Sequence, residues 1–218
     1  MKKLIALSLA IIMICSTFVG CSLFAKDKED NSSQIKYSEG LEFILSNDGE
    51  SYWLKGMGSC TDTEIVIPST YNNLPVTGIC DDAFRDQTSI TSVVIPDSVT
   101  SISTGAFTNC ASLASVVIGN SVEFICFQAF AGCNSLTSIV IPSSVTRMEP
   151  GVFVGCTSLK KVIFEDPSNW GCGEYEYDPI YDIYRWVVIP IEEDFSNPEI
   201  AAQLLTSTYV NEFLDRIK

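Results

Sequence analysis

The stretch SITSVVIPDSVTSISTGAFTNC, residues 89–110, decides the fold because related stretches follow it at a constant distance. The next copies are SLASVVIGNSVEFICFQAFAGC at 112–133 and SLTSIVIPSSVTRMEPGVFVGC at 135–156, which gives a repeat of 23 residues. Apolar residues recur in phase, and one such row contains Phe84, Phe107, Phe130 and Phe153. A fixed period of this length is typical of stacked coils, so these rings should lie one above another.

Each repeat contains a short segment with the spacing of a β-strand. In the quoted copy, Ile90, Val93 and Ile95 follow the pattern L-x-x-L-x-L, and β-branched residues surround them. Pro96 ends the segment because proline lacks a backbone donor. A single coil buries too little apolar surface to offset the entropy lost on ordering. We therefore predict a β-rich solenoid with short parallel strands in each coil and one shared core.

The strand segments also predict which side chains face solvent, because side chains alternate along a strand. Three successive copies place these outward residues in equivalent positions. They are Thr91, Ser92 and Val94; Ala114, Ser115 and Val117; and Thr137, Ser138 and Val140, followed in a fourth copy by Lys160, Lys161 and Ile163. The strip is uncharged over three copies, and it is our candidate binding face. The alternative is that its Val and Thr rows only stabilise neighbouring strands.

One repeat position holds a cysteine in three copies, namely Cys110, Cys133 and Cys156. These residues form either a metal-binding or thiol ladder, or a column of small buried residues at a corner of the coil. Three equivalent cysteines cannot all pair with one another. Seven cysteines lie beyond residue 21, and an odd number does not suit a disulfide framework. We expect buried, unpaired thiols.

The copied block I-P-x-S-V-T-x-I, followed by A-F-x-x-C-x-S-L-x-x-V-x-I-P, resembles the BspA-type leucine-rich-repeat proteins of bacterial surfaces. The resemblance covers about residues 38–218. It implies a leucine-rich-repeat solenoid, and a function in adhesion or in binding host or cell-wall components. It also implies a closing helix near residues 205–209. These motifs are specific for the fold and leave the function open.

The ends of a solenoid expose apolar edges and need covers. Residues 43–57 have the pattern of a β-hairpin with its turn at 47–49, which predicts an N-terminal cap. A C-terminal helix is expected to begin at Ser196, with Glu199 at capping-box spacing. Tyr209, Phe213 and Ile217 continue that helix at a spacing of four.

The segment 167–190 interrupts the repeat and is rich in acidic and aromatic residues. Glu174, Glu176, Asp178 and Asp182 allow three interpretations: a calcium loop, a carbohydrate-binding patch or an acidic capping loop. The glycine-punctuated spacing of a calcium loop is absent, and nothing predicts the cleft of a glycosidase. We therefore expect a capping loop.

The first twenty residues predict an export signal. Lys2 and Lys3 precede an apolar run over 4–19 that is short for a membrane span of roughly 20 residues. The residues FVGC at 18–21 resemble a bacterial lipobox, which implies that Cys21 carries a diacylglycerol and anchors the chain in the membrane. Cleavage without lipid attachment is the alternative. Polar residues after Cys21 predict a flexible tether.

The predicted organisation has five parts. They are a signal peptide at 1–20, a tether at 21–37, an N-terminal cap with the first coil at 38–78, the 23-residue repeats at 79–165, and a C-terminal cap at 166–218.

Composition excludes several functions. The formal net charge is −14, and it becomes −16 without residues 1–20, which contain two lysines and no acid. Such a chain does not suit binding to nucleic-acid backbones. The chain has no histidine, which excludes Ser–His–Asp and Cys–His catalysis and His-ligated metals. We expect no catalytic residue, no metal and no cofactor.

The sequence thus predicts a non-enzymatic lipoprotein of the bacterial cell surface, whose repeat face binds or adheres to a protein or glycan. A carbohydrate-active enzyme that uses the acidic C-terminal segment is one alternative. An envelope spacer without a ligand is another.

Overall fold

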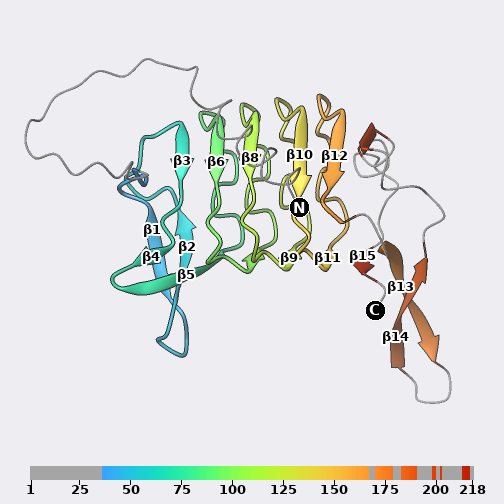
Figure 1. The fold of residues 1–218 in the computed structure, drawn as a ribbon. Helices are drawn as coiled ribbons and strands as arrows, with labels where there is room; N and C mark the ends of the chain where they lie inside the picture. The colour runs from blue at the N-terminus through green and yellow to red at the C-terminus, as the bar shows by residue number, and fades with distance from the viewer. Residues whose placement is uncertain are drawn as a thin grey trace, which may run out of the picture. The chain divides into compact units, whose positions relative to one another are not determined.

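The 23-residue units form successive coils of a β-solenoid in the computed structural model (Figure 1). The structure describes residues 36–166, 170–178, 183–190, 198–199, 202 and 213–216. On one side of the coils, each coil contributes a short strand that runs parallel to the next. These strands are β3 (Glu64–Val66), β6 (Ser92–Val94), β8 (Ser115–Val117), β10 (Ser138–Ile141) and β12 (Lys161–Phe164). The first three form one sheet, and β10 with β12 forms another.

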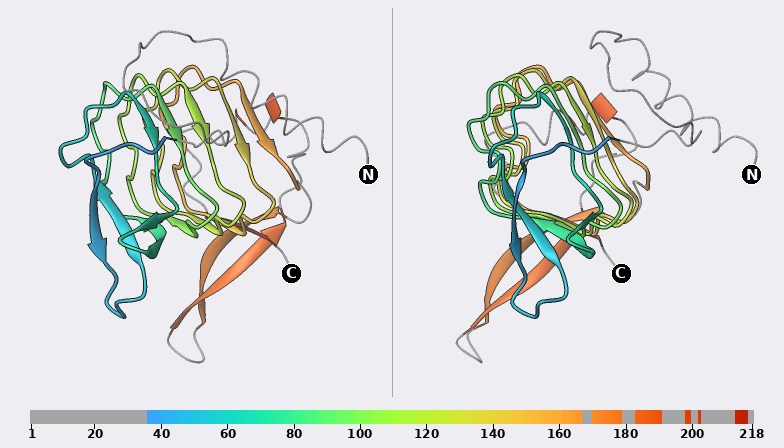
Figure 2. Two further views of the ribbon diagram at one scale, coloured as in Figure 1. Left: turned by 60° about the vertical axis from the view of Figure 1, so that its left-hand side comes forward. Right: turned by 90° about the vertical axis from the view of Figure 1, so that its left-hand side faces the viewer.

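The pairing register of these strands equals the sequence repeat. Ser92 lies opposite Ser115, and Ser138 lies opposite Lys161, which are separations of 23 residues. A slip of one residue would turn the apolar row outward, so burial of that row fixes the register. Two views of the ribbon show the coils stacked one behind another (Figure 2).

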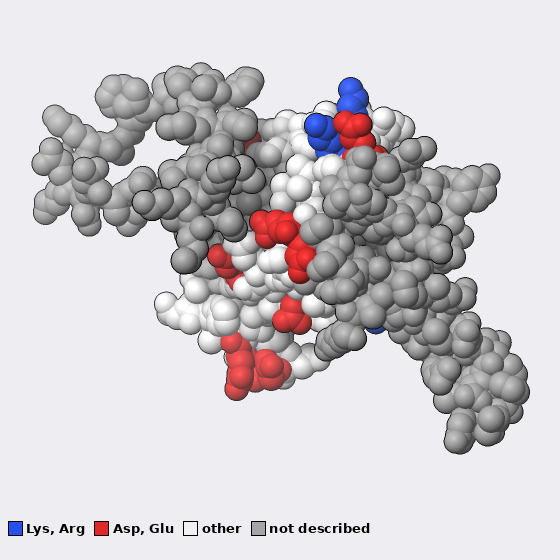
Figure 3. All heavy atoms as spheres, turned by 45° about the vertical axis from the view of Figure 1, so that its right-hand side comes forward, with Lys and Arg blue, Asp and Glu red and all other residues white. Residues whose placement is uncertain are grey.

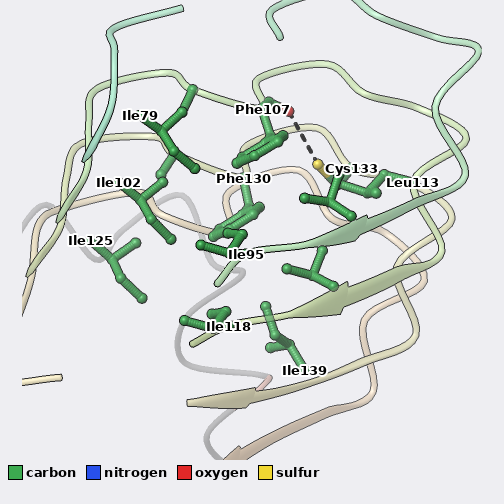
Figure 4. Packing of buried hydrophobic residues seen from close by; sticks show 14 of the residues in the cluster. Ile79, Ile95, Ile102, Phe107, Leu113, Ile118, Ile125, Phe130, Cys133 and Ile139 are labelled. Carbon is green, nitrogen blue, oxygen red and sulfur yellow. Dashed lines mark hydrogen bonds between the residues drawn. The ribbon is translucent and has the colours of Figure 1, made fainter. Parts of the chain in front are cut away.

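A second side of each coil carries shorter parallel strands. These are β5 (Leu74–Ile79), β7 (Ser101–Ile102), β9 (Phe124–Ile125) and β11 (Arg147–Met148). They join strands from both ends of the unit 36–218 in a ten-stranded sheet. The inward row of this side, which includes Ile79, Ile102 and Ile125, is fully buried (Figure 4).

The phenylalanine row confirms the predicted stacking. Ring centroids of Phe84 and Phe107 are 5.0 Å apart, those of Phe107 and Phe130 are 5.2 Å apart, and those of Phe130 and Phe153 are 5.8 Å apart. The planes of neighbouring rings differ by 2° to 11°. All four side chains are completely buried, so the repeat creates a continuous aromatic column inside the core.

The hairpin expected over residues 43–57 is present as β1 (Glu42–Leu45) and β2 (Tyr52–Gly56). Leu54 of β2 is fully buried in the core, and β2 pairs in parallel with β5. Glu64 pairs with Ser92, which is 28 residues further along the chain, so the first coil is five residues longer than the others. Part of this excess forms a second hairpin between β4 (Thr70–Tyr71) and β5, whose turn is Asn72–Asn73.

The C-terminal part differs from the expected loop and helix. The segment predicted as a capping loop contains two antiparallel strands, β13 (Trp170–Asp178) and β14 (Ile183–Pro190). Pro198 and Glu199 are helical, as predicted. The prediction that the helix continues through Phe213 is wrong, because Phe213–Arg216 is strand β15. β15 pairs with β11 and with β13. A spacing of four also fits a strand, and pairing with the free edge of β11 decides between the two.

The predicted signal, most of the tether and the lipid-attachment residue Cys21 lie outside the described residues. Asp182 and residues 203–212 lie outside them as well. Within the described part of the chain, no helix is long and apolar enough to cross a membrane.

Candidate functional site

The candidate site is the outer face of β6, β8 and β10, which we call the repeat face. It consists of the nine predicted outward residues, Thr91, Ser92, Val94, Ala114, Ser115, Val117, Thr137, Ser138 and Val140. The structure brings them together: β6 and β8 pair directly, and β10 follows β8 in the stack (Figure 1). None of the nine side chains is buried, whereas the inward neighbours Val93, Val116 and Ile139 are.

Exposure differs along the repeat face. Ala114 and Ser115 are exposed, and Val117 keeps 39% of its surface. Val94 and Val140, on either side, are half-buried. The most accessible part of the repeat face is therefore its middle strand, β8.

The hydroxyl groups on the repeat face differ in their partners. The Thr91 hydroxyl donates to the backbone carbonyl of Thr63 at 3.1 Å. The hydroxyls of Ser115, Thr137 and Ser138 make no hydrogen bond to any residue that the structure describes. These three groups are therefore available to an external partner at no cost in internal hydrogen bonds.

Charge is confined to the two ends of this side. Glu64 on β3 and Lys161 on β12 occupy the positions equivalent to Ser92, and both are exposed. Lys160 and Ile163, the other outward residues of the fourth copy, are exposed as well. An uncharged strip on three strands thus lies between Glu64 on β3 and Lys161 on β12.

The cysteine row is a structural column inside the core. Cys110, Cys133 and Cys156 are buried and unbonded, as expected. Each thiol donates to a phenylalanine carbonyl of the preceding coil: Cys110 to Phe84 at 3.0 Å, Cys133 to Phe107 at 3.3 Å (Figure 4), and Cys156 to Phe130 at 3.0 Å.

Burial raises the pKa of Cys110 to about 12. The thiol therefore stays protonated near neutral pH and is a poor nucleophile or metal ligand. Among the residues with described side chains, no three Cys, Asp or Glu groups gather to form a metal site. The acidic side chains at 174–178 lie outside that set, so the calcium and sugar interpretations of the segment stay untested.

Sequence reasoning missed the apolar residues exposed on the second side of the coils. Phe124 on β9 keeps 42% of its surface, although its neighbours in register are Ser101 and Arg147. The signal was present in the alignment of the repeats, because an aromatic residue stands there at an outward position that is polar in the adjacent copies.

Comparison with known proteins identifies the repeat. Residues 58–172 match the family model for the BspA type leucine rich repeat region, with 6 copies. A search of the curated proteins gives no match.

Two solved structures share the fold. A leucine-rich repeat protein from Bacteroides capillosus ATCC 29799 has 32% identity and a TM-score of 0.53, over 62% of this chain and 100% of that one. The T. pallidum leucine rich repeat protein has 27% identity and a TM-score of 0.54, over 60% of this chain and 64% of that one. This chain thus matches less than two thirds of the T. pallidum protein. The family match spans more than half of the chain, and we conclude that the chain belongs to the BspA-type leucine-rich-repeat family.

Proposed function

We propose that this protein is an exported surface protein that binds or adheres to a macromolecular partner through the repeat face. The observation that carries the proposal is the uncharged strip of outward Ser, Thr, Ala and Val side chains on three neighbouring strands. Family membership supports it, because the BspA-type repeat supplies a rigid scaffold with a regular exposed face.

A protein surface fits the repeat face better than a glycan does. The nine residues include no aromatic ring on which a sugar could stack, and they include three valines that offer β-branched apolar contact. The free hydroxyls of Ser115, Thr137 and Ser138 can bond to backbone or side-chain groups of a partner. Binding, not catalysis, is the proposed activity.

The test compares two lysine substitutions at exposed positions. Ser115→Lys places a charge in the centre of the uncharged strip, whereas Thr88→Lys places it at an exposed position outside the repeat face. We expect the full chain with Ser115→Lys to retain less of the proteins captured from a bacterial or host surface extract. The Thr88→Lys chain should match the wild type. Equal capture by both variants would contradict the proposal.

We also propose that Cys21 is the site of lipid attachment. The lipobox-like residues 18–21 support this, and the tether that follows gives the repeat unit reach from the membrane. Mass spectrometry of the mature N-terminus should find a diacylglycerol on Cys21, and detergent phase separation should place the protein in the detergent phase. An unmodified N-terminus in the aqueous phase would instead indicate a freely secreted protein.

A further inference from the structure

The outer surface of the ten-stranded sheet carries one row of residues that crosses six strands in register. We call it the outer row; it lies on the second side of the coils, away from the repeat face. Its members are Ile44, Trp53, Gly78, Ser101, Phe124 and Arg147, on β1, β2, β5, β7, β9 and β11 respectively. The inward neighbours Leu54, Ile79 and Ile125 are fully buried, so the row itself faces outward.

Trp53 lies flat on this sheet. A Cβ atom built on Gly78 would lie 2.7 to 2.8 Å from three atoms of the six-membered ring of Trp53, namely Cδ2, Cε2 and Cε3. Because these distances are nearly equal for adjacent ring atoms, Gly78 lies against the flat face of the indole and not against its edge. Glycine at 78 therefore seats the indole against the backbone. One face of the half-buried indole is covered, and the opposite face is turned away from the sheet.

Phe124 completes the aromatic part of the outer row. Gly78 pairs with Ser101, and Ser101 pairs with Phe124, so two strand steps of about 4.8 Å separate the seated indole from Phe124. The small Ser101 lies between the two rings. Phe124 keeps 42% of its surface and Ile44 keeps 50%. The solenoid core does not need an aromatic ring at position 124, because the adjacent copies carry Ser101 and Arg147 there.

The charges around the outer row disfavour an anionic ligand. Five of the six members are uncharged, Arg147 beside Phe124 being the exception, and Lys55 on β2 is paired with Glu42 at 2.8 Å. The exposed carboxylates of Glu123 and Asp81 adjoin the strands that carry Phe124 and Gly78. On the face drawn in Figure 3, acidic side chains are spread over the described surface, whereas basic ones gather mainly in one place. Polyanions would therefore be repelled.

We infer that the outer row is a binding platform for an uncharged glycan. An indole that lies flat cannot insert into a pocket of a protein partner as a protruding anchor does. It offers a π-face with apolar surface, onto which the C–H face of a sugar ring can stack. Phe124 offers a second aromatic contact about 10 Å away, a distance that a short oligosaccharide spans. Ser101 lies between the two rings, and its hydroxyl, which also bonds with the Cys126 thiol, keeps a lone pair that can accept from a sugar hydroxyl.

The experiment uses the full chain in a detergent without a sugar headgroup. Cellohexaose and chitohexaose are the neutral probes, and an oligogalacturonate is the anionic control. We expect tryptophan emission to change on titration with at least one neutral probe and to remain unchanged with the anionic one. Trp53→Phe, which keeps a ring over Gly78, should remove the emission change while calorimetry still detects weaker binding.

Two matched phenylalanine variants locate the platform. Phe124→Ser installs the residue of the preceding coil within the outer row, and it should weaken glycan affinity about fivefold or more. Phe127 has the same 42% exposure but lies three residues further along the coil, outside the outer row. Phe127→Thr, which installs the residue found at Thr104, should leave the affinity unchanged.

Three results would overturn the inference. They are the absence of an emission change with both neutral probes, equal loss of affinity in the two phenylalanine variants, and a response only to a lysine-rich amphipathic peptide, which is titrated in parallel as a protein-like probe. The last would assign the outer row to a protein partner. These outcomes are independent of the proposal for the repeat face. Ser115, whose substitution tests that proposal, lies on a different sheet from the outer row.

Discussion

Both sides of each coil bury apolar side chains on their inner surface, but they differ in the side chains that they present to solvent. Strands of three or four residues support the repeat face, whose outward side chains are small, uncharged and free of aromatics. The second side has two-residue strands at β7, β9 and β11, yet it carries a seated indole and an exposed phenylalanine. Its strands also continue into hairpins at both ends of one large sheet.

The 23-residue repeat therefore constrains the side chains of the core and leaves those of the exterior free to vary. Phe107 and Phe124 belong to the same solenoid, and one is completely buried whereas the other is 42% exposed. Replacement of Phe107 must disturb two stacked neighbours, whereas the residues in register with Phe124 in the adjacent coils are Ser101 and Arg147, which have no aromatic ring to stack on it. The predictions below test whether this division between core and exterior is real.

The largest effect is expected for Phe107→Ala in the buried column. Loss of the ring leaves a cavity between Phe84 and Phe130, which should lower the free energy of unfolding by about 3–5 kcal/mol. Urea denaturation followed by circular dichroism measures this change. A cost below about 1 kcal/mol would mean that the coils can collapse around the gap and that the column is not essential.

A smaller loss is expected for Gly78→Ala on the second side. The added methyl group would lie 2.7 Å from Cδ2 of Trp53 and would lift the indole, at a cost of about 1–3 kcal/mol. The same substitution in a Trp53→Ala background should cost much less, because the clash is gone. Equal costs in both backgrounds would show that the glycine serves the backbone and does not seat the ring.

The Cys110 thiol should make stability fall at alkaline pH. Burial raises the pKa of Cys110 from 9.0 to about 12, so the folded chain holds its proton after the unfolded chain has lost it. The contribution of the Cys110 thiol to the free energy of unfolding is therefore fully present below pH 9 and is lost as the pH rises toward about 12. The slope from this group is at most about 1.4 kcal/mol per pH unit.

Denaturation curves of the wild type and of Cys110→Ala, recorded from about pH 8 to about pH 10, isolate that slope. The variant should show a shallower decline than the wild type. Parallel curves would mean that the Cys110 thiol ionises equally well in the folded and unfolded states.

The smallest effect on stability is expected for Phe124→Ser in the outer row. The preceding coil already has Ser101 at this position, and the ring is 42% exposed, so the change should stay within about 0.5 kcal/mol. Thermal or urea denaturation beside Phe107→Ala gives the direct contrast. A loss comparable to that of Phe107→Ala would contradict the division between core and exterior.

Much of the fold was predictable from the sequence, and particular residues show why. Phe84, Phe107, Phe130 and Phe153 recur at one interval, and stacking of coils is the arrangement that buries all four together. The same phase predicted that Ser115 and Ser138 face solvent and that Cys133 is buried. The spacing of four between Tyr209, Phe213 and Ile217 predicts a helix but fits a strand equally well, and Phe213 lies in strand β15.

A periodic local pattern was enough to specify the coil, its register and which side chains point inward or outward. Only the tertiary structure decided that β15 pairs with β11 and that Trp53 lies over Gly78. Each contact joins a strand of the solenoid to a segment outside the 23-residue repeat, β15 in one case and β2 in the other. Their geometry depends on where the ends of the solenoid place those segments, and no repeat period encodes that position.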